Sequence, residues 1–254
     1  MNQVEFEETK ESFSILSKRD GFGDIFKLLG VLFDTQLTML PMINHLVTKM
    51  GNKLKALFRV RKFYNLSQYV RMYKCQLWST AEWCTAAIYH APATSLAKID
   101  NIQRKFLKFV DLPDAEAFLN YNLAPMALRR AISLLGLIYK CVHKVAPVRL
   151  QTLFTRKGVE VRPATRSHTG SHNLQLVDPL DGSQSSLMTR SIFGLIRYWN
   201  ALPQGTVNAK SVKTFQRSIQ WLSKEAIRSG MSIQHVCELR FLTVPYDVLT
   251  RSSS

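Results

Sequence analysis

The chain has 254 residues, of which 46% are hydrophobic, and it carries a formal net charge of +16 with a pI near 9.9. This length and apolar content predict one large or two small folded domains and exclude a wholly disordered tail. The charge favours a polyanionic partner, nucleic acid ahead of an anionic membrane surface, while a merely solvated basic surface stays a plain alternative.

The four cysteines form no CxxC pair, so neither a zinc signature nor a disulfide framework is expected. No apolar run reaches the roughly 18 residues that a membrane span needs. Acidic residues follow Met1, which is typical of neither a secretory signal nor an Arg-rich transit peptide. We therefore expect a nuclear or cytoplasmic protein with reduced thiols and no membrane partner.

Two short strands are expected at the start of the chain. Ser12–Ser17 is predicted to pair, through the glycine-containing turn 20–24, with a strand at Ile25–Phe33. The second strand holds one glycine, Gly30, which indicates a buried strand that another backbone or a ligand approaches closely. A two-stranded unit is marginal alone, and no later segment alternates well enough to join it. Residues 1–36 are therefore interpreted as the edge of a domain.

Helical periodicity follows. Apolar residues at three- and four-residue steps from Ile43 to Phe58 share one face of a long helix. Further helices are expected from Ser67 toward Tyr89, from Thr94 or Ser95 to the break at Pro113, from Met126 to about Val145, and at Val148–Phe154. Together these segments predict one helical domain, residues 37–155.

Residues 156–186 have no period and are rich in basic, serine and glycine residues, which predicts a long, basic, flexible loop. His168 and His172 are spaced like metal ligands, but no third ligand lies nearby, so no metal site is expected. Helices are predicted again at Leu187–Leu202, Val212–Ile227 and Ile233–Arg240, forming an extension over 187–254. The expected fold class is mainly α, a helical bundle with an N-terminal β-hairpin and a helical C-terminal extension.

The charge is concentrated in the first long helix. From Thr35 to Ala81 the chain has many Lys and Arg residues but no Asp or Glu. Lys49 and Lys53 flank the apolar face of this helix on one side, and Lys55, Arg59 and Lys62 flank it on the other. A solvated helix normally carries both signs, so this run indicates contacts with phosphates.

Several motifs resemble the C-terminal part of reverse transcriptases from non-LTR retrotransposons. The primer-grip hairpin of that family is similar to Lys27-Leu28-Leu29-Gly30, where Leu28 replaces an aromatic residue. Its thumb is similar to the basic helix followed by Tyr73-Lys74 and Asp100-Asn101-Ile102-Gln103. The most specific match is Trp199-Asn200-Ala201-Leu202-Pro203 with Ser211-Val212-Lys213-Thr214-Phe215. A core anchor at Trp199 explains this last match without any chemistry.

The resemblance implies a palm remnant at 1–36 with its primer-grip hairpin, a thumb at 37–155 and an extension at 187–254 of an RNA-directed DNA polymerase. The paired aspartates that hold Mg²⁺ in the intact enzyme are expected just before residue 1. The chain alone is therefore expected to be inactive, without a cofactor or catalytic residue of its own. Lys10 is the one candidate accessory lysine, and a plain surface lysine is the alternative.

The implied partners are an RNA–DNA hybrid or RNA, together with the remainder of the polymerase. A stand-alone basic helical module that binds RNA or an acidic protein is the alternative that stays open. The candidate nucleic-acid-binding residues are Lys27, Gly30, Lys49, Lys53, Lys55, Arg59, Arg61, Lys62, Lys74, Arg104 and Lys105.

Overall fold

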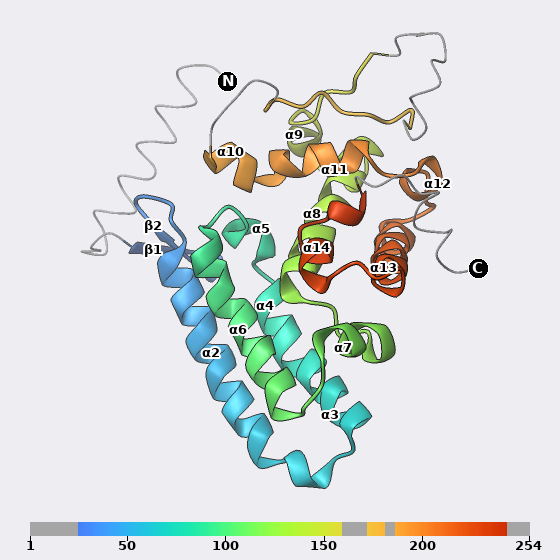
Figure 1. The fold of residues 1–254 in the computed structure, drawn as a ribbon. Helices are drawn as coiled ribbons and strands as arrows, with labels where there is room; N and C mark the ends of the chain where they lie inside the picture. The colour runs from blue at the N-terminus through green and yellow to red at the C-terminus, as the bar shows by residue number, and fades with distance from the viewer. Residues whose placement is uncertain (1–24, 159–171, 181–185, 243–254) are drawn as a thin grey trace.

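A computed structural model describes residues 25–158, 172–180 and 186–242 (Figure 1). These residues form a short β-hairpin followed by helices that surround two hydrophobic clusters. The expected fold class is confirmed at this level: the protein is mainly helical with a two-stranded hairpin before the helices. Lys10 and the predicted strand Ser12–Ser17 lie outside the described residues.

The hairpin consists of β1 (Ile25–Leu28) and β2 (Val31–Asp34), which pair antiparallel with Phe26 opposite Phe33. The two rings stack at 5.3 Å between centroids. The prediction of one continuous strand over 25–33 is wrong, because the chain reverses at Leu29 and Gly30. Both residues have positive φ, 48° and 85°. Positive φ at both central residues is the geometry of a type I′ hairpin turn, which Gly30 favours and Leu29 disfavours.

Asp34 ties the hairpin to the first long helix, α2 (Leu40–Arg59). Its carboxylate accepts hydrogen bonds from the Thr38 N–H at 2.9 Å, the Thr38 hydroxyl at 2.8 Å and the Met39 N–H at 2.8 Å. Burial acts to raise the pKa of Asp34, but these hydrogen bonds outweigh it and the pKa lies below its ordinary value. The predicted helix of residues 43–58 is confirmed, with the start fixed by Asp34.

The segment after α2 contains more elements than expected. They are η1 (Arg61–Phe63), α3 (Leu66–Tyr73), the π-helical η2 (Lys74–Trp78), α4 (Ser79–Glu82), α5 (Thr85–Ile88), α6 (Ala93–Phe109) and α7 (Asp114–Tyr121). The cap of α3 is Asn65 rather than Ser67, because Asn65 and Gln68 form a reciprocal capping box. α7 was not predicted: Pro113 not only stops α6 but also precedes a new helix.

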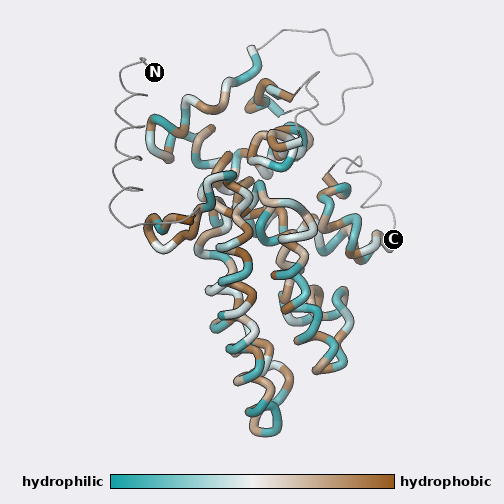
Figure 2. The backbone as a smooth tube through the Cα atoms, turned by 90° about the vertical axis from the view of Figure 1, so that its left-hand side faces the viewer, coloured by the Kyte–Doolittle hydropathy of each residue, from teal (hydrophilic) through white to brown (hydrophobic). Residues whose placement is uncertain are grey.

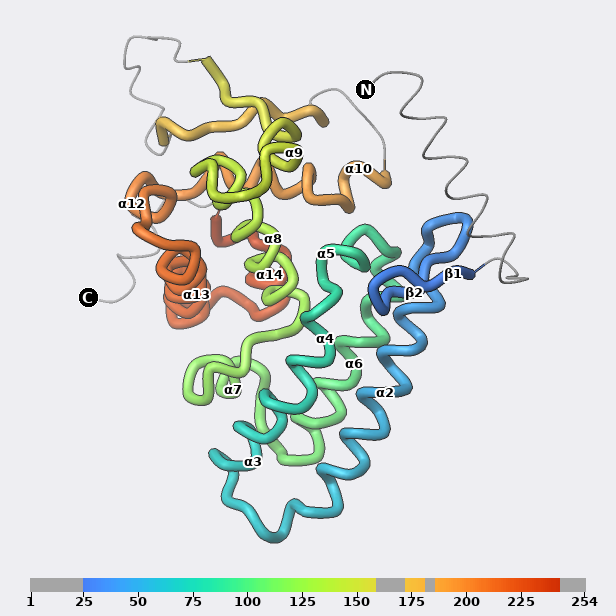
Figure 3. Tube along the Cα trace, turned by 180° about the vertical axis from the view of Figure 1, so that it is seen from behind, coloured from blue at the N-terminus to red at the C-terminus, as the bar shows by residue number. Residues whose placement is uncertain are grey.

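Helices α2 and α6 run side by side in the same direction (Figures 1 and 3). Near their starts Lys98 donates to the Asn44 side chain at 3.2 Å, and at their ends the rings of Phe58 and Phe109 stack at 3.9 Å. Their inner faces, with η2 and α4, enclose the first hydrophobic cluster. Figure 2 shows hydrophobic and hydrophilic residues alternating along these helices, as amphipathic packing requires.

The second cluster is built around α8. Its helices are α8 (Met126–Val142), α9 (Val148–Gln151), α10 (Ser186–Arg190), η3 (Ile192–Leu195), α11 (Ile196–Asn200), α12 (Gln204–Val207), α13 (Val212–Arg228), α14 (Ile233–Cys237) and η4 (Arg240–Leu242). Most buried residues of α8 belong to this cluster, and α8 packs on α13. α8 was expected within the block 37–155, but its core is shared with the helices after residue 186.

The predicted helix Leu187–Leu202 is broken at Ser191, whose backbone is extended at φ −81° and ψ −177°. Here α10 and η3 approach so closely that a Cβ on Gly194 would lie 2.0 Å from the Thr189 carbonyl oxygen. The break therefore depends on a glycine contact across the bend, which helical periodicity does not reveal.

Candidate nucleic-acid interface

Four exposed cations line one side of the α2–α6 pair: Lys55, Arg59, Lys98 and Lys105. We call this set the basic face. Lys98 contacts Asn44 across the two helices, which fixes the side of each helix that borders the seam. Lys55 lies about three helical turns after Asn44, and Lys105 about two turns after Lys98, so both lie on that same side. Arg59 follows one turn after Lys55.

The acidic side chains within residues 35–110 are both paired with arginines. Residues 35–110 contain only two acids, Glu82 and Asp100. Glu82 pairs with Arg129, and Asp100 receives two hydrogen bonds from Arg130 at 2.6 and 2.8 Å. The exposed Asp111 lies just beyond, after the Phe109 ring that stacks on Phe58. With four cations the face keeps an excess of positive charge, as a surface that attracts phosphates requires.

Two predicted binding residues lie away from this face. Lys49 lies about 120° around α2 from Lys55, and Arg104 lies about 100° around α6 from Lys105. Both side chains are exposed. Arg61 and Lys62 lie beyond the end of α2, in η1, which forms the far tip of the long helical arm (Figure 1).

Two further lysines of the predicted set are held by contacts inside the protein. Lys53 donates to the Gln76 carbonyl at 3.1 Å and to the Thr80 hydroxyl at 2.6 Å, which ties α2 to η2 and α4. Lys74 donates to the Tyr121 carbonyl and lies over the Trp78 ring. Burial and the nearby Arg129 and Lys224 lower the pKa of Lys74. Both lysines therefore take part in the packing of the helices.

The hairpin residues have different surroundings. Lys27 is exposed on β1, opposite Leu32. Gly30 lies in the turn beside Trp83, and a Cβ there would meet that ring at 3.4 Å, which is an ordinary contact. The positive φ of Gly30 is therefore the main local reason for a glycine.

The thumb-like motif Asp100–Gln103 points inward. Gln103 is 3% exposed, accepts from the Trp78 indole at 3.4 Å and donates to the Ala124 carbonyl at 3.1 Å. Together with the Asp100–Arg130 pair, these bonds join α6 to η2 and to the start of α8. The sequence analysis did not predict that Asp100 and Gln103 point inward. The available signal was two polar residues three positions apart on an otherwise apolar side of the helix.

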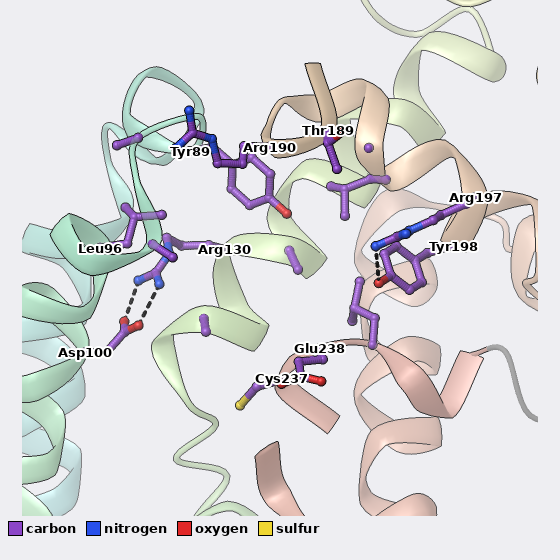
Figure 4. A pocket seen from close by; sticks show the side chains of 17 residues that line it. Tyr89, Leu96, Asp100, Arg130, Thr189, Arg190, Arg197, Tyr198, Cys237 and Glu238 are labelled. Carbon is purple, nitrogen blue, oxygen red and sulfur yellow. Dashed lines mark hydrogen bonds and ion pairs between the residues drawn. The ribbon is translucent and has the colours of Figure 1, made fainter. Parts of the chain in front are cut away.

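A pocket of about 320 Å³ lies where the two clusters meet (Figure 4). Tyr89, Arg190 and Tyr198 line it, with the paired Asp100 and Arg130 at one side. Burial raises the pKa of Tyr89 to about 12, so its hydroxyl stays protonated at neutral pH.

Cys237 lines the same pocket, and burial raises the pKa of its thiol to about 11. A protonated thiol is a weak nucleophile. Both Tyr89 and Cys237 therefore stay protonated at neutral pH.

The predicted loop 156–186 contains a fixed segment. Residues 172–180 lie against α11, with Leu176 fully buried. The side-chain amide of Asn200 exchanges two hydrogen bonds with the backbone of Leu176, both at 2.8 Å, and the Trp199 indole donates to the Leu174 carbonyl at 2.9 Å. Trp199 and Asn200 therefore supply the hydrogen-bond partners that a backbone without helix or strand needs.

His172 has both ring nitrogens occupied in this segment. Its Nε2 donates to the Trp199 carbonyl at 2.9 Å, and its Nδ1 accepts from the Leu174 N–H at 3.1 Å. Burial lowers the pKa of His172, although the bond to Trp199 opposes the shift. His168, considered with it as a metal ligand, lies outside the described residues.

Within 25–158, 172–180 and 186–242, no three His, Cys, Asp or Glu side chains gather as metal ligands. Glu82 and Asp100 are bound to arginines, so neither offers a free carboxylate for the Mg²⁺ of a polymerase. In the same residues, no helix combines the length and apolar content needed to cross a membrane. Comparison with protein-family models, with curated proteins and with solved structures found no match to this chain.

Proposed function

We propose that this chain is the nucleic-acid-gripping part of a reverse transcriptase of the non-LTR class, and that it holds a duplex along the α2–α6 basic face. The observation that carries the proposal is the seam between the two parallel helices. Lys55, Arg59, Lys98 and Lys105 line it, and the two acids within residues 35–110 are paired with arginines. The motif resemblance at the hairpin, the basic helix and Trp199 supports the choice of family.

The physical mechanism is contact with phosphates. A clamp that lets a duplex slide has to contact the phosphates of the duplex and not the base edges. The affinity of such a clamp depends on salt more than on sequence. Helix α2 has 20 residues. This corresponds to about 30 Å, close to one turn of a nucleic-acid duplex at roughly 34 Å. Cations spaced by one or two helical turns along such a helix can follow one strand.

The test is a salt titration of binding to a blunt RNA–DNA hybrid. A variant with Lys55, Arg59, Lys98 and Lys105 all changed to Glu should bind roughly 100-fold more weakly near physiological salt. The slope of log K against log salt should become shallower by about one for each cation removed. All four side chains are exposed, so the variant should keep its fold.

A matched control changes the same amount of charge elsewhere. Four exposed cations lie in the part of the chain that forms the second cluster: Lys140, Lys144, Arg149 and Lys213. Changing them to Glu alters the net charge by the same amount. If both quadruple variants lose hybrid affinity to the same extent, binding follows overall charge and the basic face is not the site. Preference for one RNA or one acidic protein over the hybrid favours the alternative of a stand-alone binding module.

A further inference from the structure

The tip of the helical arm combines exposed aromatic rings with cations. It is the connection between α2 and α3, where Phe63 is 68% and Tyr64 39% exposed. Arg59 and Lys62 are exposed beside them, and the Lys62 ammonium lies 5.1 Å from the centroid of the Phe63 ring. An exposed phenylalanine among cations differs from an ordinary polar loop, because it offers a stacking surface with counter-charges for phosphates.

Hydrogen bonds fix the backbone of this tip. Phe63 N–H donates to the Val60 carbonyl at 3.1 Å, and the Arg61 guanidinium donates to the Tyr64 carbonyl at 2.9 Å. On the following helix, the buried Tyr69 hydroxyl donates to the Leu57 carbonyl at 3.0 Å. The Phe63 ring is thus presented from a fixed turn, which lowers the entropy cost of binding a ring against it.

From these observations we propose that the tip binds unpaired nucleotides: a base stacks on Phe63, and Arg59 and Lys62 contact the adjoining phosphates. The occupant is single-stranded nucleic acid because the exposed rings lie beside Arg59 and Lys62, in a stretch of sequence with no acid between residues 35 and 81. This inference rests on the proposed function and extends it. The basic face takes the duplex, and the tip takes the strand where pairing ends.

The experiment compares a blunt RNA–DNA hybrid with the same hybrid carrying a short single-stranded extension. The wild-type protein should bind the extended form more tightly. Phe63→Ala should weaken binding of the extended form by about 5- to 150-fold, the range for one lost base–aromatic stack, and leave the blunt form within about twofold. Phe63→Trp should keep the affinity, whereas Phe63→Leu should behave like Phe63→Ala, because stacking needs a ring and not only an apolar side chain.

Trp221→Ala is the matched control, since Trp221 is a 48% exposed aromatic residue on α13, which belongs to the second cluster. It should change neither affinity. Equal loss on both substrates with Phe63→Ala, no loss on either, or full affinity with Phe63→Leu overturns the inference. Binding of wild type, but not of Phe63→Ala, to vesicles of phosphatidylserine and phosphatidylcholine in place of the extension also overturns it, in favour of a membrane contact.

The two proposals can fail separately. If the blunt hybrid does not bind but a single strand binds in a Phe63-dependent manner, the duplex clamp is wrong and the tip site stands. If the blunt hybrid binds through the basic face and the extension adds no affinity, the clamp stands and the tip site is wrong.

Discussion

The first half of this protein turns its motif residues both outward and inward, whereas the second half turns Trp199 and Asn200 inward. Around the first cluster, Lys55, Arg59 and Lys105 face solvent, whereas Tyr73 and Gln103 are buried. Around the second cluster, Trp199 and Asn200 of the most specific motif face inward and hold residues 172–176. A motif match alone therefore does not say whether a residue contacts a partner or completes a core; its burial and hydrogen bonds decide.

The largest expected effect tests whether Trp199 serves the core. Trp199→Ala removes a fully buried ring and its hydrogen bond to Leu174, and should lower the free energy of unfolding by about 3–5 kcal/mol, measured by urea denaturation. Trp221→Ala, on an exposed ring, should change it by less than about 0.5 kcal/mol. If Trp199→Ala stays as stable as wild type but loses nucleic-acid binding, the contrast between the two halves is wrong.

A smaller effect depends on pH. The pKa of His172 is lowered by burial below the value of 6.5 expected in the unfolded chain. The unfolded chain therefore takes up a proton first, and the free energy of unfolding should fall as pH falls through about 6.5 toward the lower folded pKa. Protonation of Nδ1 also ends its acceptance of the Leu174 N–H.

His172→Gln should flatten the pH dependence between about pH 7 and pH 5, and should cost about 1–3 kcal/mol at pH 7 through the buried hydrogen bonds that it disturbs. Denaturation curves across this range check it. His235→Gln is the control, because that side chain is exposed on α14. An unchanged pH profile in His172→Gln would show that residues 172–176 are not fixed by this ring.

The smallest effect concerns the hairpin. Leu29 is 92% exposed and has φ 48°, a conformation that Asn tolerates better than Leu. Leu29→Asn should therefore raise the free energy of unfolding by about 1 kcal/mol, seen as a higher urea midpoint with an unchanged slope. A loss of stability instead means that Leu29 packs against an apolar surface in solution, so that the tip of the hairpin is not solvent-exposed.

The long helices could be predicted from sequence because their apolar periodicity is strong. α2, α6, α8 and α13 each begin and end within a few residues of the expected bounds. The strand pattern missed the turn at Leu29 and Gly30, since Leu29 is a poor residue for its conformation, whereas the resemblance suggested a hairpin at residues 27–30. The bend at Ser191 was missed because it depends on a contact between Gly194 and Thr189 that exists only in the folded chain.

The candidate site was only half predictable for a related reason. The acid-free basic stretch from Thr35 to Ala81 is visible in the sequence. The side of the helix pair on which each cation lies is not, because it depends on how α2 packs against α6. Lys74 has the composition of a binding residue, yet its partner is the end of a helix nearly fifty residues away. Such long-range backbone partners have no signature in local spacing.

The end of α7 is where the two clusters depend on each other. Lys74, from the first, donates to the Tyr121 carbonyl, while Lys224, from α13 in the second, donates to the Leu119 carbonyl at 3.1 Å and to Asn122 at 2.5 Å. Carbonyls at a helix terminus otherwise lack donors, so each half finishes a helix that neither could finish by itself. Attempts to express either half separately by dividing the gene near Asn122 should therefore give insoluble products, whereas co-expressed halves should reassemble.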